Sequence, residues 1–105
     1  MFRRVQEAGR SVDLGFIVVR AARRPPENAT VGARLGLAVS RKAGNAVQRN
    51  RIKRLVREVF RKRAVALPSL DFVVSARAGA ADRSLADYEA AFETLTRRLL
   101  ASEVR

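Results

Sequence analysis

The sequence predicts a two-layer α+β fold in which helices pack on one β-sheet. The segment 46–63 contains no glycine or proline and places its apolar residues on one side, as an amphipathic helix does. Residues 16–21 and 71–76 are short and rich in β-branched and aromatic residues, which is typical of strands. Because these elements alternate along the chain, a mixed architecture of one sheet and its covering helices is expected.

The first part of the chain supplies most of the predicted strands. Met1–Ala8 is predicted as a short helix, and Arg10–Asp13 as a short strand. Phe16–Ala21 is the first long strand, and Arg34–Ser40 alternates in the same way. Arg23–Gly32 contains two adjacent prolines and is predicted as an exposed connection. The simplest pairing joins the two longer strands as an antiparallel hairpin.

Strand alternation gives the first long strand two different faces. Ile17 and its alternating partners form an apolar face, whereas Phe16, Val18 and Arg20 form a mixed face. In the following strand the small residue Ala38 lies on the face opposite the leucines. The mixed face is therefore expected to be only partly covered.

The second half of the chain reads as helix, strand and helix. Asn45 is suited to cap the helix Ala46–Arg63. The strand Asp71–Ala76 follows, and Ser84 begins the last helix with Asp87 as its capping-box partner. The apolar stripe predicted for this last helix consists of Leu85, Tyr88, Phe92, Leu95 and Leu99.

Composition narrows the possible functions. The 105 residues are expected to form a single domain, residues 1–105. Lys and Arg number 22 against 10 Asp and Glu, so the formal charge is +12 and a polyanionic partner is expected. Cysteine and histidine are absent, which excludes disulfides, thiolate zinc sites and histidine bases. No apolar run is long enough to span a bilayer and no signal peptide is seen, so a cytoplasmic protein without a membrane partner is expected.

The acidic residues do not suggest a catalytic centre. Only Glu89 and Glu93 have the spacing that places two carboxylates together on a helix, and a two-metal nuclease site needs more ligands. Ser40 has no histidine to activate it. We therefore expect no catalytic residue, no metal site and no cofactor in the protein itself.

The predicted helix 46–63 carries the charge on one side. On a helical wheel, its apolar residues fill a sector of about 140°, and the opposite sector of about 100° is almost purely cationic. That sector contains Asn50, Lys53, Arg54, Arg57 and Arg61. Glu58 is the only acid in the helix, and Arg54 or Lys62 can pair with it. Because like charges three and four residues apart repel, a bound counter-charge is the favoured explanation.

Other interpretations of the charge remain open at this point. The chain can be a generically basic protein, or a protein that binds anionic membranes through a basic amphipathic helix. A DNA-binding regulator would use 46–63 as a recognition helix, but a strand, not a helix, is predicted before Asn45. A ribosome-associated RNA-binding protein is a further possibility.

The segment from Ala38 to Glu58 resembles the protein subunit of bacterial ribonuclease P. The tripeptide Arg49-Asn50-Arg51, followed by Lys53-Arg54-Leu55 and Arg57-Glu58, is similar to the signature of that family, and Ser40 to Asn45 also match. Weaker similarity extends from Phe2 to about Leu100.

The resemblance implies a fold and separate roles for the protein and its RNA partner. The fold is an α-β-β-β-α-β-α sandwich of the ribosomal S5 domain 2-like type, with a left-handed βαβ crossover that contains the signature helix. The general right-handed rule predicts the opposite hand. The implied partners are the catalytic ribonuclease P RNA subunit and precursor tRNA, with no protein partner required. The RNA hydrolyses the phosphodiester with bound Mg²⁺, and the protein assists removal of the 5′ leader.

The resemblance also implies two sets of contact residues. Contacts with the catalytic RNA are expected from the signature positions and from Arg61 of the same cationic sector: Arg41, Lys42, Asn45, Arg49, Asn50, Arg51, Lys53, Arg54, Arg57 and Arg61. The cleft for the single-stranded 5′ leader is expected to contain Phe2, Gln6, Phe16, Val18, Arg20 and Ala38. Gln6 and Arg20 stand where the family has aromatic residues, so the leader contact is expected to be more electrostatic.

Overall fold

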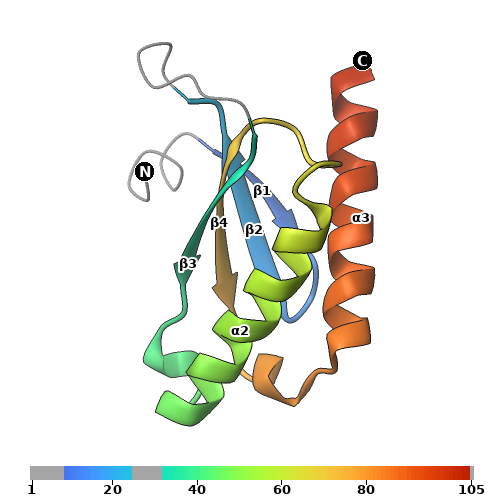
Figure 1. Cartoon of the computed structure of the whole chain (residues 1–105). Helices are drawn as coiled ribbons and strands as arrows, with labels where there is room; N and C mark the ends of the chain where they lie inside the picture. Colours follow the sequence, from blue (N-terminus) through green and yellow to red (C-terminus); the bar gives the residue numbers. More distant parts are fainter. Residues whose placement is uncertain (1–8, 25–31, 105) are drawn as a thin grey trace.

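The computed structural model describes residues 9–24 and 32–104, with side chains through Ala101 (Figure 1). The predicted helix Met1–Ala8 lies outside the described residues. Two short 3₁₀ helices, η2 and η3, accompany the strands and α-helices. In chain order, the elements are β1 (Arg10–Asp13), β2 (Ile17–Ala22), β3 (Arg34–Ala38), η2 (Arg41–Ala43), α2 (Ala46–Arg63), β4 (Asp71–Ala76), η3 (Ala80–Asp82) and α3 (Leu85–Val104).

The four strands form one sheet in the order β1-β2-β4-β3. β1 pairs with β2 and β2 with β4 in antiparallel orientation, whereas β3 and β4 are parallel. The predicted hairpin between the strands at 16–21 and 34–40 is therefore wrong, because β4 lies between them. The first four residues of β4 are buried, which fits its central position with a partner strand on each side.

The connection from β3 through α2 to β4 is a left-handed crossover. The two strands point the same way, and α2 lies on the near face of the sheet in Figure 1. This is the hand implied by the family resemblance, and it is opposite to the hand of almost all such connections.

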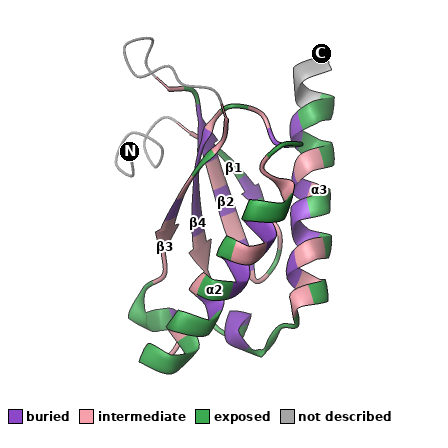
Figure 2. Ribbon diagram, in the orientation of Figure 1, coloured by how far each residue is buried: buried purple, intermediate pink, exposed green. Residues whose placement is uncertain are grey.

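The core lies between the sheet and the two long helices, which cover the same face (Figure 2). The predicted stripe of α3 is buried except for Leu85, which is half-buried. All five residues of the predicted apolar sector of α2 are buried as well: Ile52, Leu55, Val56, Val59 and Phe60. From the sheet, β2 and β4 supply Ile17, Val19, Phe72 and Val74. These residues hold α2 in one rotational setting, with its charged side outward.

Both long helices begin with a capping box: the Ser84–Asp87 box was predicted, and at α2 the predicted cap Asn45 forms a box with Gln48. In α2, the backbone N–H of Gln48 donates to Asn45 Oδ1 (2.9 Å), and the N–H of Asn45 donates to Gln48 Oε1 (2.8 Å). At α3, the N–H of Ser84 donates to Asp87 Oδ2 (3.0 Å), and the N–H of Asp87 donates to Ser84 Oγ (3.1 Å). The hydrogen bonds with Ser84 lower the pKa of Asp87 below its usual value.

Gly44 is required by the capping box of α2. Its φ is +140°, and a Cβ added there would lie 2.3 Å from Gln48 Oε1. Gly44→Ala is expected to open the box and to lower the free energy of unfolding by about 1–2 kcal/mol, measured by chemical denaturation. Gly79→Ala is the control, because Gly79 has a φ of +91° but nothing within 4 Å of the added Cβ. Equal losses in the two variants would contradict a specific role for the box.

Tyr88, the only tyrosine of the chain, is fully buried in the core. Its hydroxyl donates to the carbonyl oxygen of Ala80 (2.7 Å), and burial raises its pKa from 10.0 to about 12. The folded state therefore favours the neutral phenol. This contribution to stability is complete below pH 10 and is lost as the pH rises from 10 towards 12. Tyrosinate absorbance is expected to appear only near pH 12 or together with unfolding; ordinary titration near pH 10 in the folded protein would contradict this.

Candidate nucleic-acid interface

The outer side of α2 presents a row of cationic side chains over the buried core. Asn50, Arg54, Arg57 and Arg61 are exposed, and Lys53 is half-buried. Arg54, Arg57 and Arg61 line a surface hollow together with Glu58. The sequence placed these residues in one sector of the helix, and the structure confirms that placement.

The single acid of α2 does not neutralise this row. The carboxylate of Glu58 lies 3.8 Å from Lys62 Nζ, which also lies 3.5 Å from the carboxylate of Glu89 on α3. Of the two partners predicted for Glu58, Lys62 is the one found. Within the described part of the chain, Arg54, Arg57 and Arg61 have no carboxylate within ion-pair distance, so their charge faces outward uncompensated.

The side chains of the signature tripeptide, Arg49-Asn50-Arg51, point in different directions. Asn50 is exposed on the outer side, whereas Arg49 is half-buried and its Nε lies 3.4 Å from the carbonyl oxygen of Asn45. The guanidinium of Arg51 donates to the carbonyl oxygens of Ala81 (2.9 Å) and Arg83 (3.3 Å). The side-chain oxygen of Asn45 is occupied by the helix cap. These predicted contact residues are therefore near one another but differ in how freely they can meet a ligand.

The basic loop before α2 contains the 3₁₀ helix η2. Arg41 and Lys42 are exposed, and Ala43 is buried and anchors the turn against the core. This arrangement places two more cations next to the start of α2.

The sheet face opposite the helices carries the predicted leader-cleft positions of the strands. Val18 and Arg20 of β2 stand opposite Ser75 and Val73 of β4, and Ala38 of β3 adjoins Ser75. Val18, Arg20 and Ala38 are half-buried. The three are thus brought together on one face, as predicted.

Phe16 does not lie on that face, and the prediction that it does is wrong. Its ring centroid is 4.9 Å from that of the buried Tyr88, and the guanidinium of Arg83 lies 5.0 Å from the centre of the Phe16 ring. Phe16 thus packs on the helix side of the sheet. Alternation applies only within a strand, and β2 begins at Ile17, after a turn at Gly15 with φ +95°. Phe2 and Gln6, the other predicted cleft residues, lie outside the described residues.

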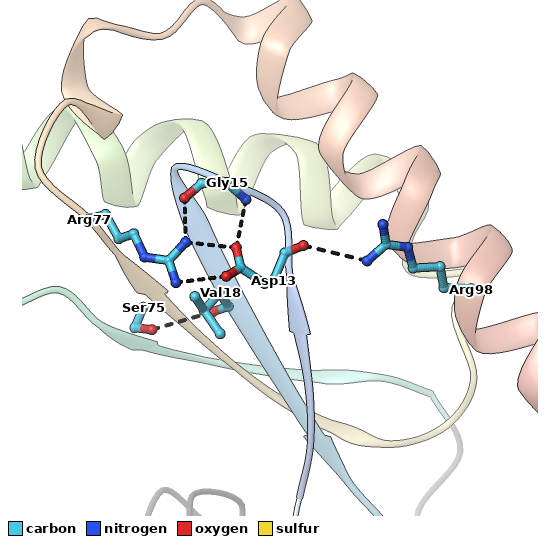
Figure 3. A network of polar contacts seen from close by, with 6 residues as sticks. All are labelled: Asp13, Gly15, Val18, Ser75, Arg77 and Arg98. Carbon is cyan, nitrogen blue, oxygen red and sulfur yellow. Dashed lines mark hydrogen bonds and ion pairs between the residues drawn. The ribbon is translucent and has the colours of Figure 1, made fainter.

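An ion pair that the sequence did not suggest closes one end of the sheet (Figure 3). Arg77, just after β4, contacts Asp13 of β1 through two hydrogen bonds of 2.7 and 2.8 Å, and it also donates to the carbonyl oxygen of Gly15 (2.6 Å). The hydrogen bonds from Arg77 to the carboxylate, followed by the one that the Gly15 N–H donates to Asp13 Oδ1 (2.9 Å), lower the pKa of Asp13 to about 2. Arg98 of α3 approaches the carbonyl oxygen of Asp13 (3.4 Å).

A second missed network lies at the other end of β4. Asp71 is fully buried and accepts two hydrogen bonds from Arg34, of 2.7 and 2.8 Å. The Nε of Arg24 lies 3.1 Å from the same carboxylate, and the Arg24 side chain is only 3% exposed. Arg24 also donates to the carbonyl oxygen of Gly32. The prediction that 23–32 is wholly exposed is therefore wrong at Arg24.

Two further observations concern the described part of the chain. It contains no group of three acidic, histidine or cysteine side chains that could hold a metal ion. None of its helices has the length and apolar character that crossing a membrane requires.

The left-handed crossover and the uncompensated cationic helix define a basic α+β protein with the surface of a polyanion-binding protein. A family model described as Ribonuclease P matches residues 1–100. The chain belongs to this family.

Relatives and solved structures agree with this assignment. The ribonuclease P protein component of Salmonella arizonae is 50% identical over 66 residues, 62% of this chain and 56% of that protein. That of Macrococcus caseolyticus is 43% identical over 77 residues, 72% of this chain and 64% of that protein. The matched segment thus spans less than two thirds of either relative.

The fold agrees with solved members of the family. The RNase P protein of Staphylococcus aureus superimposes with a TM-score of 0.80 at 34% identity, over 93% of this chain and 87% of that one. The Thermotoga maritima protein gives 0.79 at 29% identity, over 92% of this chain and 89% of that one. The predicted fold class is confirmed.

Proposed function

We propose that this chain is the protein subunit of a ribonuclease P ribonucleoprotein. It binds the catalytic RNA subunit and the 5′ leader of precursor tRNA and assists endonucleolytic removal of the leader in the cytoplasm. It acts as one domain and needs no other protein partner. The observation that carries the proposal is the row Arg54, Arg57 and Arg61, which faces outward without compensating acids in a chain of this family.

Contact with the catalytic RNA is assigned to α2 and η2. Three arginines in successive turns repel one another, and a phosphate backbone removes that repulsion while releasing its own condensed counterions. The exposed Arg41 and Lys42 extend the same positive surface beyond the start of the helix. This arrangement supports binding to a folded polyanion more than binding to a small anion.

Contact with the leader is assigned to the sheet face opposite the helices. Val18, Arg20 and Ala38 are half-buried neighbours on this face. A guanidinium can pair with a phosphate or stack on a base. Arg20 can therefore bind the single-stranded leader although no aromatic residue stands at that position. We expect this contact to depend more on salt than one built on stacked aromatics.

The chemistry is assigned to the RNA. Of the acids whose spacing suggested a carboxylate pair, Glu89 lies beside Lys62, and the carboxylate of Asp71 is held by two arginines. Within the part of the chain that the structure describes, these carboxylates contact basic side chains and are not gathered into a set of oxygen ligands, so the proposal places Mg²⁺ on the RNA subunit.

Reconstitution tests this function. The full chain is added to bacterial ribonuclease P RNA and precursor tRNA at low Mg²⁺, and cleavage is compared with that by the RNA alone. Cleavage at the 5′ end of the mature tRNA is expected to increase, and the chain without RNA is expected to leave the substrate intact. Unchanged cleavage by the RNA would refute the proposal. Equal affinity for duplex DNA would favour the DNA-binding alternative.

A further inference from the structure

The first turns of α2 are not held by apolar packing. Residues 46–51 bury no side chain, and Val47 is 78% exposed; the first buried residue of the helix is Ile52. Figure 2 shows these turns as the exposed end of the helix. The same turns carry Arg49 and Asn50. Because a helix end without apolar packing frays easily, polar contacts must hold these turns, and the capping box between Asn45 and Gln48 is one of them.

Arg51 adds a contact between these turns and a distant segment of the chain. Its Nε donates to the carbonyl oxygen of Ala81 (2.9 Å), and a terminal nitrogen donates to that of Arg83 (3.3 Å). Both acceptors belong to the backbone at η3, a segment that is itself well anchored. Ala80 and Ala81 are buried, and the carbonyl oxygen of Ala80 accepts the hydrogen bond from the buried Tyr88. Arg51 thus connects a loosely packed helix end to the core.

The direction of the Arg51 side chain also separates it from the outer row. Helical spacing places Arg51 on the same side of α2 as Glu58 and Lys62. That side faces α3, since Lys62 reaches Glu89 there. Two of the guanidinium N–H groups are already used by protein carbonyls, which limits the bidentate contact that arginine makes with phosphate.

We propose that Arg51 is a positioning residue: it anchors the first turns of α2 to η3 and thereby presents Arg49 and Asn50 to the RNA, and it does not itself bind a phosphate. This inference rests on the proposed function, because it assigns a role within the same RNA interface. Arg51 thus has a different role from the arginines that neutralise the charge of the RNA.

The test compares Arg51→Gln with Arg54→Gln, which remove the same charge from the same helix. In the free protein, Arg51→Gln is expected to speed amide hydrogen exchange at residues 48–51, the hydrogen-bonded amides of these turns, by about tenfold, and Arg54→Gln to leave it unchanged. With ribonuclease P RNA, Arg54→Gln is expected to reduce the slope of log affinity against log salt by about 0.7–0.9. Arg51→Gln is expected to weaken binding by about 3–10-fold with the slope unchanged.

Two further variants distinguish positioning from direct contact. Arg51→Lys keeps the charge but reaches only one carbonyl, so affinity is expected to fall nearly as in Arg51→Gln, whereas a phosphate contact would largely survive. Asn50→Ala is expected to lose less affinity in the Arg51→Gln background than alone, because the anchor acts through Asn50. Binding is measured well below the melting temperature of each variant, so that loss of folded protein does not contribute.

Several outcomes overturn the inference: unchanged amide exchange in Arg51→Gln, a slope reduced as in Arg54→Gln, or additive losses with Asn50→Ala. The proposed function fails in a different way, through absence of RNA binding by the wild-type chain or an unchanged slope in Arg54→Gln. In that case the exchange measurement on the free protein still decides whether Arg51 anchors α2.

Discussion

Replacing Asp71 with asparagine is expected to lower the free energy of unfolding by about 3–5 kcal/mol, because it removes the carboxylate beside the buried Arg24. The Arg24 side chain is 3% exposed and that of Asp71 is fully buried, so water cannot replace the lost interaction. A domain of this size is stable by only about 5–15 kcal/mol. Urea denaturation followed by circular dichroism is expected to show a midpoint shifted far below that of the wild type.

Two variants identify the cause of that loss. Arg34→Gln removes the partner that is 46% exposed and leaves the buried pair intact, so a smaller loss of about 1 kcal/mol is expected. Arg24→Met combined with Asp71→Asn removes the buried cation as well, and is expected to recover part of the stability lost in Asp71→Asn. A loss below 1 kcal/mol for Asp71→Asn alone would show that the carboxylate does not compensate a buried charge.

The second large effect is expected for RNA affinity. Neutralising Arg54 and Arg57 together, both to glutamine, is expected to reduce the salt slope of binding to ribonuclease P RNA by about 1.4–1.8 and to weaken binding by at least tenfold at moderate salt. Both side chains are exposed and line one surface hollow, so the fold is expected to remain stable within about 0.5 kcal/mol. Filter binding across a salt series measures both quantities.

The matched control neutralises Arg97 and Arg98 on α3. These residues are also exposed, and the change lowers the formal charge by the same amount, from +12 to +10. A mere effect of net charge predicts equal losses in the two double variants. A contact with the outer side of α2 predicts a clearly larger loss for Arg54 and Arg57, and equal losses would therefore contradict it.

The elements predicted best from the sequence are those set by local pattern. The helix Ala46–Arg63 and the strand Asp71–Ala76 have the predicted bounds. The helix is recognised by a cationic and an apolar side at helical spacing, and the strand by a short apolar run. Both patterns lie entirely within the segment that they predict. The capping residues Asn45 and Ser84 were predicted for the same reason: their partners lie three residues away.

Strand pairing was not predictable in this way. The alternation of side chains shows which residues of β2 and β3 share a face of the sheet, but it does not show which strand each of them pairs with. A hairpin is only the simplest pairing of two consecutive strands. The insertion of β4 between them depends on where α2 finds a surface to cover. The hand of the crossover followed only from the family resemblance, since the general rule predicts the opposite.

The polar contacts between distant residues could not be predicted from the sequence either. Arg24 with Asp71, and Arg77 with Asp13, join residues far apart in sequence, and nothing in their neighbourhoods distinguishes them from solvated charges. Arg51 was expected to contact the RNA because it stands at a signature position. The helical wheel leaves it outside the cationic sector, but the wheel cannot show the carbonyl groups of η3 that its guanidinium meets. Phe16 was misplaced by extending the strand pattern one residue too far.

The place of β4 in the sheet has a consequence during protein synthesis. The ribosome releases β1, β2, β3 and α2 before the strand that joins them, so a nascent chain that ends at residue 70 contains only the β1-β2 ribbon. Two strands alone are marginally stable in water, and β3 has no neighbour at that stage. The apolar side of α2 therefore has no complete sheet to pack against until residues 71–76 emerge from the exit tunnel. The domain is expected to fold in one late step.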